Sequence, residues 1–334
     1  MPALAVARAL RAEEPAAEIL LVGKKGGPEE RLVPDAGFAF AAVRIAGFDR
    51  DAPWKNVRLA GLPLAVVAGL RILDGFKPDV VLGMGGYAMA PAVFAARMRR
   101  VPYVLHEKDV RPGLATRMFA RAAAAVCTTL PGTEDRMPGV RTVMTGVPIR
   151  DGFASREPAV PPRRLLVIGG SQGALRLNTA VWAVLDELCG RFEEVIHVAG
   201  RQGAGEIDLR RRPGYTAFAF TERVTELMAR ADVVVSRAGV GAIAEIAAVG
   251  LPAVLVPGEF GGGHQVLNAE AVAAAGGAVV VRDREFTGAR LLQELDGLAD
   301  SRLRGMAAAM RTLARPDAAR RVVEVVREVA AAPR

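Results

Sequence analysis

Short apolar runs that alternate with helical stretches restrict the folds open to this chain more than any other feature. The runs are rich in β-branched residues, and the stretches between them are rich in Ala, Leu and Arg. Apolar strands with helices between them are typical of parallel sheets covered on both faces. The sequence therefore predicts an α/β protein with two doubly wound domains. The two sets of runs are Ile19–Gly23, Val80–Gly83, Tyr103–His106 and Val140–Gly146, then Leu165–Gly170, Val195–Gly200, Tyr215–Phe220, Val233–Ser236, Ala253–Pro257 and Ala278–Arg282.

A proline-rich stretch separates the two sets. Residues 148–162 carry four prolines among charged residues, which is the composition of a linker. We expect one domain over residues 1–147, joined by a C-terminal helix at residues 316–334, and a second domain over residues 148–315. Ligands of doubly wound sheets bind at the carboxyl ends of the strands. We therefore expect the binding residues at these ends, where the two domains face a cleft.

The composition favours a small anionic ligand over nucleic acid. The 334 residues carry a formal charge of +8, which suits nucleotides, diphosphates or an anionic membrane face. Few aromatic residues and no run of five basic residues argue against nucleic acid. Cys127 and Cys189 lie far apart without metal-ligand spacing, so we expect two buried thiols in a reducing cytosol. No segment has the pattern of a signal peptide or of a membrane span.

A glycine-rich stretch, GGSQGALRLN at residues 169–178, directly follows the apolar run that ends at Ile168. It matches neither the dinucleotide fingerprint G-x-G-x-x-G nor the ATPase loop G-x-x-x-x-G-K-[ST]. Its glycines let the backbone approach a ligand, and Ser171 can cap the following helix or bond an oxygen. The stretch therefore predicts an anion at a helix N-terminus, without saying which one.

The second domain contains a longer series of polar residues at strand ends. The stretch ADVVVSRAGVGAIAEIAAVG has a buried strand, a glycine turn and then Glu245 in the next helix. The turn offers N–H groups to a diphosphate, and Glu245 can accept hydrogen bonds from ribose hydroxyls. His264, Gln265 and Asn268 follow the next strand. Each residue alone also fits a solvated surface position, but the ordered set favours a nucleotide-sugar site.

These motifs resemble those of the MurG family, the bacterial glycosyltransferases that make lipid II for the cell wall. The resemblance covers nearly the whole chain and implies the GT-B fold, two Rossmann-like domains around a cleft. It implies transfer of N-acetylglucosamine from UDP-N-acetylglucosamine to lipid I with inversion, in peptidoglycan synthesis, cell shape and cell division. It also implies no cofactor and no metal. The matching segments are GMGGYAMAPAVFAA (83–96), PYVLHEKDVRPGLATRMFAR (102–121), TGVPIR (145–150), GGSQGALRLN and SRAGVGAIAE…HQ.

The resemblance assigns roles to particular residues. Glu245 would hold the ribose, the backbone near Thr221 would contact the uracil, and Gln265 beside His264 would face the sugar. Gly85, Gly86 and Tyr87 match the loop that would face the lipid diphosphate. The full set of donor contacts is Asp109, Arg150, Ser171, Thr221, Val240, Gly241, Ala242, Glu245, His264 and Gln265.

Two departures from the family pattern concern the acceptor side. The family's H-E-Q-N is His106-Glu107-Lys108-Asp109 in this chain. The family also begins with a strand and the loop G-G-T-G-G-H, whereas this sequence begins with MPALAVA, the predicted helix that follows. We therefore expect the first domain to lack a central strand and the usual candidate base, which leaves Asp109 and Glu107 as weak candidates. Asp49-Arg50-Asp51 matches the D-x-D pattern of metal-dependent transferases, but we interpret it as a solvated loop.

We also expect peripheral attachment to the cytoplasmic face of the membrane. Residues 54–73 place Leu62, Val66, Leu70 and Leu73 at helical spacing beside Lys55, Arg58 and Arg71, although an ordinary core-facing helix from about Pro63 fits the same spacing. Three other functions also fit: a GT-B transferase with a different acceptor, a UDP-sugar epimerase, and a non-catalytic UDP-sugar-binding remnant. The segments at 83–121 favour the lipid-linked acceptor.

Overall fold

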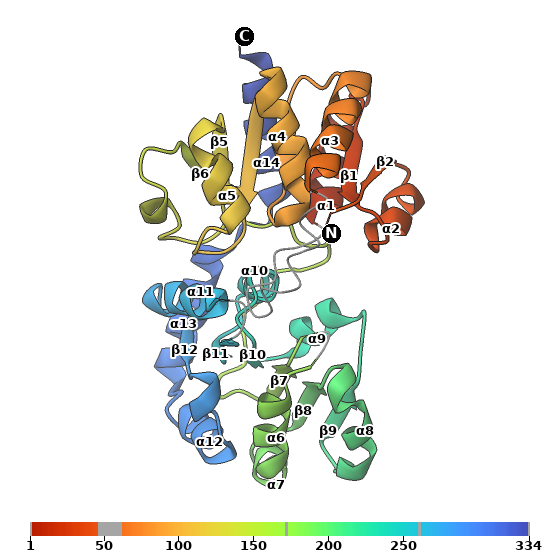
Figure 1. Ribbon diagram of the computed structural model, residues 1–334. Helices are drawn as coiled ribbons and strands as arrows, with labels where there is room; N and C mark the ends of the chain where they lie inside the picture. The colour runs from red at the N-terminus through yellow and green to blue at the C-terminus, as the bar shows by residue number, and fades with distance from the viewer. Residues whose placement is uncertain (1, 46–61, 171–172, 260–261, 333–334) are drawn as a thin grey trace. The chain divides into compact units, whose positions relative to one another are not determined.

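The computed structural model describes residues 2–45, 62–170, 173–259 and 262–332 (Figure 1). The chain divides into two compact units, Met1–Arg150 with Pro316–Arg334, and Asp151–Arg315. The first unit contains α1 (Pro2–Glu13), β1 (Leu20–Lys24), α2 (Glu29–Asp35), β2 (Ala39–Val43), α3 (Leu62–Phe76), β3 (Val81–Gly83), η2 (Tyr87–Met89), α4 (Ala90–Arg99), β4 (Tyr103–Glu107), α5 (Leu114–Phe119), η3 (Ala120–Ala122), β5 (Ala125–Thr128), η4 (Glu134–Arg136), β6 (Thr142–Met144) and α14 (Ala318–Ala331).

The strands of the first unit form two parallel sheets. One pairs β1 with β2, and the other has the order β3-β4-β5-β6. Within the described residues, no strand pairs with the second edge of β1 or with the second edge of β3. Two strands, β2 and β5, are not among the runs predicted from the sequence. The predicted N-terminal helix is confirmed as α1.

Helices hold the two sheets of the first unit together. On α1, Leu4 and Ala7 pack with the side chains around β1, whereas Val6 packs with the cluster that contains β4 and β5. α3 crosses α4 so closely that a Cβ on Gly69 would lie 2.5 Å from the carbonyl oxygen of Pro91. The sheets therefore share their helical cover although their strands do not pair.

The C-terminal helix α14 belongs to the first unit. Its valines, among them Val322 and Val326, pack against Val104 and Cys127 of the central strands. An ion pair of 2.7 Å between Arg141 and Glu328 joins the same helix to the segment before β6. Burial raises the pKa of the Cys127 thiol to about 12, so this thiol stays protonated at neutral pH. Cys189 in the second unit is only half-buried, and both cysteines are free.

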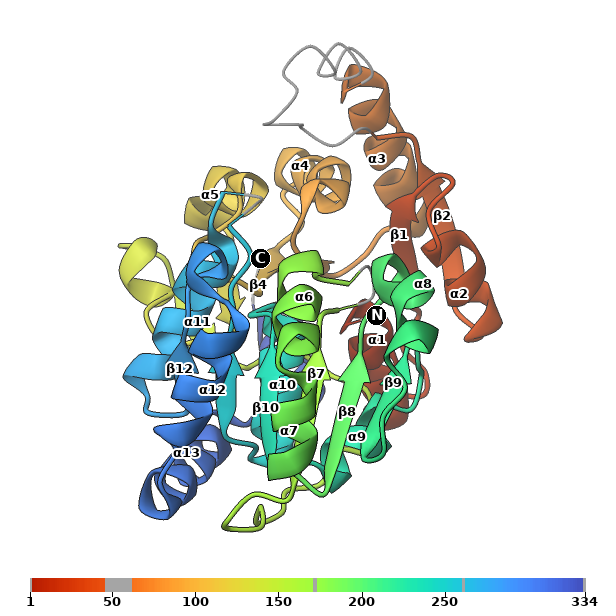
Figure 2. The same cartoon turned by 90° about the horizontal axis from the view of Figure 1, so that it is seen from below.

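The second unit is a six-stranded parallel sheet with the order β12-β11-β10-β7-β8-β9. α6 packs with α12, and α10 packs with α9 and α13, so helices cover both faces of the sheet (Figure 2). Its elements are β7 (Arg164–Ile168), α6 (Leu175–Ala183), α7 (Leu185–Arg191), β8 (Glu194–Val198), η5 (Arg201–Gly203), α8 (Ala204–Ile207), η6 (Asp208–Arg210), β9 (Tyr215–Phe218), α9 (Val224–Arg230), β10 (Val233–Ser236), α10 (Val240–Val249), β11 (Ala253–Leu255), α11 (His264–Ala274), β12 (Ala278–Val280), η7 (Asp283–Glu285), α12 (Gly288–Asp296) and α13 (Asp300–Leu313).

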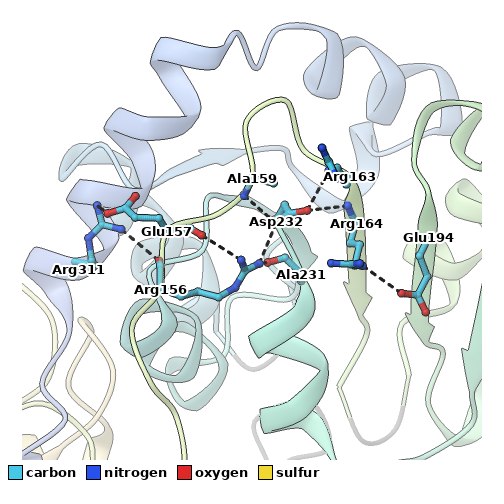
Figure 3. Close-up of polar contacts among 9 residues, drawn as sticks. All are labelled: Arg156, Glu157, Ala159, Arg163, Arg164, Glu194, Ala231, Asp232 and Arg311. Carbon is cyan, nitrogen blue, oxygen red and sulfur yellow. Dashed lines mark hydrogen bonds and ion pairs between the residues drawn. The ribbon is translucent and has the colours of Figure 1, made fainter.

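A buried carboxylate anchors the second half of the predicted linker to the second unit. Asp232 is 2% exposed and lies directly before β10. One of its oxygens accepts bonds from the Arg156 guanidinium at 3.0 Å and the Ala159 amide at 2.9 Å, and the other accepts from the amides of Arg163 and Arg164 at 3.0 Å (Figure 3). Residues 156–164 are therefore an ordered part of this unit.

The membrane-facing stripe predicted on residues 54–73 is wrong at Leu70 and Leu73. Leu73 is buried and packs with Leu70 in a core cluster of the first unit. The helix instead exposes Leu64 and Val67, which lie outside the predicted stripe. Residues 54–61, with Lys55 and Arg58, lie outside the described residues. None of the described helices is both long and apolar enough to span a bilayer.

Candidate functional site

The strand order of the second unit reverses between β7 and β10. From β7 the chain continues to β8 and β9 on one side, and from β10 to β11 and β12 on the other. Open parallel sheets bind ligands at such a reversal, outside the carboxyl ends of the strands. The glycine loop after β7 and the glycine turn before α10 are the two predicted motifs that lie there.

The N-terminus of α10 directly follows the glycine turn. The residue before the helix, Gly239, has extended backbone angles and no side chain with which to cap the helix. The first-turn N–H groups of Val240, Gly241 and Ala242 have no acceptor within the helix. These groups and the positive end of the helix dipole favour an anion such as a diphosphate. Glu245 follows on the next turn of the same helix and is half-buried.

Two predicted donor residues begin the next helix, α11. The Gln265 side-chain oxygen accepts a hydrogen bond from the amide of Gly258 at 2.9 Å, so the Gln265 amide nitrogen remains as the donor. His264 Nδ1 is buried and has no hydrogen-bond partner among the described residues. A buried polar atom without a partner is costly, and a bound ligand is one way to satisfy it.

The other residues of this unit that we expect to bind UDP-N-acetylglucosamine lie after β9 and in the glycine loop after β7. Thr221 follows β9, and its hydroxyl accepts a bond from the Arg223 amide at 3.0 Å, which closes a tight turn. In the glycine loop, a Cβ on Gly173 would lie 2.5 Å from the carbonyl oxygen of Ala199. Glycine is therefore required there for the loop to pack on the turn after β8. Ser171 lies outside the described residues.

In the first unit, the Gly85–Tyr87 loop lies against the end of β4 at His106. Gly85 and Gly86 have positive φ values of 78° and 71° and lead into η2, which exposes Tyr87. A Cβ on Gly85 would lie 3.2 Å from the carbonyl oxygen of His106, at the end of the neighbouring strand β4. His106 is 1% exposed, and its Nε2 donates to the Gly146 carbonyl at 2.9 Å. Burial lowers the pKa of His106, which favours the neutral ring.

Glu107 organises the loop that follows β4. It is 4% exposed, and its two carboxylate oxygens accept bonds from the amides of Asp109 at 3.2 Å and Gly113 at 2.9 Å. Gly113 is the residue that precedes α5, so this carboxylate holds both ends of the loop. As a base, Glu107 would have to take a proton while it accepts these bonds.

The structure brings together only some of the predicted residues. Val240, Gly241, Ala242 and Glu245 share one helix, and Gln265 and His264 begin the helix after the neighbouring strand. Arg150 and Asp109 belong to the first unit, so their contact with the donor remains a prediction. The D-x-D pattern at 49–51 lies outside the described residues.

One ion pair at the strand ends was missed by sequence reasoning. Arg237 follows β10 and is only 14% exposed at its side chain. It donates to the Val256 carbonyl at 3.0 Å and pairs with Asp283 after β12. These bonds connect the ends of β10, β11 and β12 beside the α10 turn. An arginine directly before a glycine turn is the only signal that the sequence offers for it.

Comparisons with known proteins identify the class. The family model described as "Glycosyltransferase family 28 N-terminal domain" matches residues 1–128, and the "Glycosyltransferase family 28 C-terminal domain" matches residues 164–322. The fold is similar to the crystal structure of Acinetobacter baumannii MurG, with a TM-score of 0.81 and 27% identity over 98% of this chain and 95% of that one. Two parallel-sheet units with these matches define a glycosyltransferase of the GT-B fold, which confirms the predicted fold class.

Curated relatives narrow the assignment. The chain is 37% identical to a protein of Moorella thermoacetica over 97% of this chain and 94% of that protein, and 39% identical to one of Clavibacter michiganensis over 99% and 93%. Both are named UDP-N-acetylglucosamine–N-acetylmuramyl-(pentapeptide) pyrophosphoryl-undecaprenol N-acetylglucosamine transferase. The chain belongs to this family of transferases. A putative UDP-N-acetylglucosamine 2-epimerase of Listeria monocytogenes, with a TM-score of 0.70 and 13% identity, shares only the fold.

Proposed function

We propose that the protein transfers N-acetylglucosamine from UDP-N-acetylglucosamine to lipid I and so forms lipid II, the peptidoglycan precursor on which cell shape and division depend. The N-terminus of α10 at the β7/β10 reversal, with a glycine at its cap position and Glu245 one turn further along, is the observation that carries the donor assignment. In this assignment the second unit binds the donor, and the first unit binds the lipid-linked acceptor. The curated relatives support the choice of both substrates.

The reaction is a single displacement at the anomeric carbon. The 4-hydroxyl oxygen of the muramoyl sugar attacks this carbon, and the bond from the carbon to the β-phosphate oxygen breaks. The configuration inverts because attack and departure take place on opposite faces. Negative charge develops on the leaving UDP, and the first-turn N–H groups of Val240, Gly241 and Ala242 stabilise it. The hydroxyl proton passes to a base.

The acceptor side offers two carboxylates as candidates for this base. Glu107 is buried and already accepts two backbone bonds, whereas Asp109 is half-buried on the same loop. A general base must reach the hydroxyl that it deprotonates. We therefore place Glu107 as the residue that holds the loop and Asp109 as the candidate to replace first. Gly85, Gly86 and Tyr87 lie on the neighbouring loop, which we assign to the lipid diphosphate.

Replacing Glu245 with alanine should weaken binding of UDP-N-acetylglucosamine. The ribose hydroxyls would lose their acceptor, and an unpaired polar partner typically costs about 1–3 kcal/mol. Titration calorimetry on wild type and Glu245→Ala measures this loss directly.

Glu226→Ala is the matched control, because Glu226 is an exposed carboxylate on α9 that pairs with Arg223 at the surface. Surface pairs of this kind contribute little, so the donor affinity of this variant should equal that of wild type. Equal affinity in Glu245→Ala and wild type would remove the ribose assignment. Failure of wild type to transfer the sugar to a lipid I analogue would contradict the proposed reaction.

We further propose that the first unit attaches to an anionic membrane face through three neighbouring helices. α3 exposes Leu64 and Val67, α4 exposes Phe94 and Met98, and α5 exposes Leu114 and Met118. α4 packs against both α3 and α5. We call these six residues the α3–α5 apolar surface. Exposed arginines on α4 and α5, Arg97 and Arg117 among them, lie beside it and suit anionic headgroups.

The double variant Leu64→Asp with Met98→Asp should bind vesicles of anionic lipid at least about ten-fold more weakly than wild type, because two large apolar side chains no longer enter the bilayer. Co-sedimentation measures the bound fraction, which should also fall with added salt. Leu175→Asp is the control: Leu175 is 66% exposed, close to the 75% of Leu64, but lies in the second unit. Equal vesicle binding by all three proteins would contradict the proposed surface.

A further inference from the structure

A chain of hydrogen bonds between buried and half-buried side chains in the second unit is used by none of the roles above. Asn178 on α6 and His197 on β8 are fully buried. His197 Nε2 lies 3.0 Å from Asn178 Oδ1, and His197 Nδ1 lies 2.9 Å from the Tyr215 hydroxyl on β9. The Trp182 indole nitrogen lies 2.9 Å from the same hydroxyl, and Asn178 Nδ2 lies 2.8 Å from the Ala199 carbonyl.

The two ends of this hydrogen-bond chain and the burial of His197 together set the direction of its bonds. The indole N–H of Trp182 can only donate, so the Tyr215 oxygen accepts that bond. The Ala199 carbonyl can only accept, so Asn178 directs its amide nitrogen there and its oxygen at His197, whose Nε2 must then carry a proton. Burial lowers the pKa of His197 to about 3, so at neutral pH its Nδ1 is unprotonated and accepts a bond from the Tyr215 hydroxyl.

This hydrogen-bond chain ends at the Ala199 carbonyl, where the glycine loop after β7 packs on the turn after β8. Gly173 has its Cα directly against the Ala199 carbonyl, since an added Cβ would lie 2.5 Å from that oxygen. The amide of Gly169, at the start of the loop, donates to the Val198 carbonyl at 3.2 Å. Asn178 itself fits tightly, because a Cβ on Gly203 would lie 2.8 Å from its amide nitrogen. The Ala199 carbonyl is thus held from one side by Asn178 and contacted from the other by the loop.

We propose that Asn178, His197 and Tyr215 are positioning residues for the nucleoside diphosphate of the donor. They orient the Ala199 carbonyl, the carbonyl sets the position of Gly173, and Gly173 sets the position of the backbone that enters α6. This inference rests on the proposed donor site of the second unit. A displacement of a fraction of an ångström in such backbone is enough to weaken ligand binding.

Two replacements of His197 with similar size separate positioning from packing. Gln offers an oxygen to Tyr215 and an N–H to Asn178, whereas Met fills the space and offers neither. His197→Met should raise the Kd for UDP in calorimetry, and the KM for UDP-N-acetylglucosamine, by about ten-fold. The KM for a lipid I analogue should stay unchanged. His197→Gln should stay within about two-fold of wild type in all three quantities.

Trp182→Phe is the matched control at the far end of the chain. It removes one hydrogen bond but leaves the link from His197 through Asn178 to Ala199, so it should lower Tm without raising the Kd for UDP. Wild-type Kd in His197→Met, or an equal rise in Kd in Trp182→Phe, would overturn the inference while leaving the proposed function intact. Absence of UDP binding in wild type would overturn both.

Discussion

Replacing Asp232 with alanine should lower the free energy of unfolding of the second unit by about 3–5 kcal/mol, the cost of breaking a buried charge pair. The variant leaves the amides of Ala159, Arg163 and Arg164 without their acceptor, and it removes the carboxylate that pairs with the Arg156 guanidinium. The Arg156 Nε atom is already buried without a partner among the described residues. For a unit of this size the loss corresponds to a fall in Tm of about 6–20 °C, which calorimetry measures.

Asp208→Ala is the control for this prediction. Asp208 also pairs with an arginine of the second unit, Arg211, but both side chains are at least 80% exposed. Exposed pairs contribute little to stability, so this variant should melt close to wild type. Similar Tm values for the two alanine variants would show that the carboxylate of Asp232 does not anchor residues 156–164.

Acidification from pH 8 to pH 5 should destabilise the second unit. Burial lowers the pKa of His197 from its ordinary value of 6.5 to about 3. Between these two values the unfolded chain binds a proton that the folded chain does not, so the free energy of unfolding falls as the pH falls. The contribution of His197 is fully present above pH 6.5, and about 2 kcal/mol of it is lost at pH 5.

Denaturant unfolding of wild type and His197→Gln at pH 8 and pH 5 measures this loss of stability. The glutamine keeps both hydrogen bonds and does not titrate, so its loss of stability between the two pH values should be smaller by about 2 kcal/mol. The buried His106 also has a lowered pKa, but it is present in both proteins and cancels in the comparison. Equal pH dependence of the two proteins would mean that His197 is not held neutral by burial.

The sequence was sufficient to predict the strands that are rich in β-branched side chains. Val233–Ser236 was predicted as a strand and is β10 with the same bounds, because a run of valines is favourable only in a strand with both faces covered. It was also sufficient for the glycine turns that follow these strands. Position in a parallel sheet places these turns at one edge, so the nucleotide-sugar motifs could be predicted before the fold was known.

Alanine-rich strands could not be predicted in the same way. β2 reads AFAAV, and β5 lies in AAAAVCTT, where the alanines favour a helix. β5 is a strand because it pairs with β4 and β6 on its two sides. Hydrogen bonds to segments distant in sequence thus override the local preference.

Periodicity determined that residues from about Pro63 form an amphipathic helix, but not which face is buried. Leu70 and Leu73 point into the core because Gly69 lets α3 cross α4 closely, and this leaves Leu64 exposed. The hydrogen-bond chain that runs from the Trp182 indole to the Ala199 carbonyl is likewise decided by tertiary structure alone. The same holds for the hydrogen bonds of Asp232. Each joins residues on different elements, and a buried polar group shows its role only through the partners that folding brings to it.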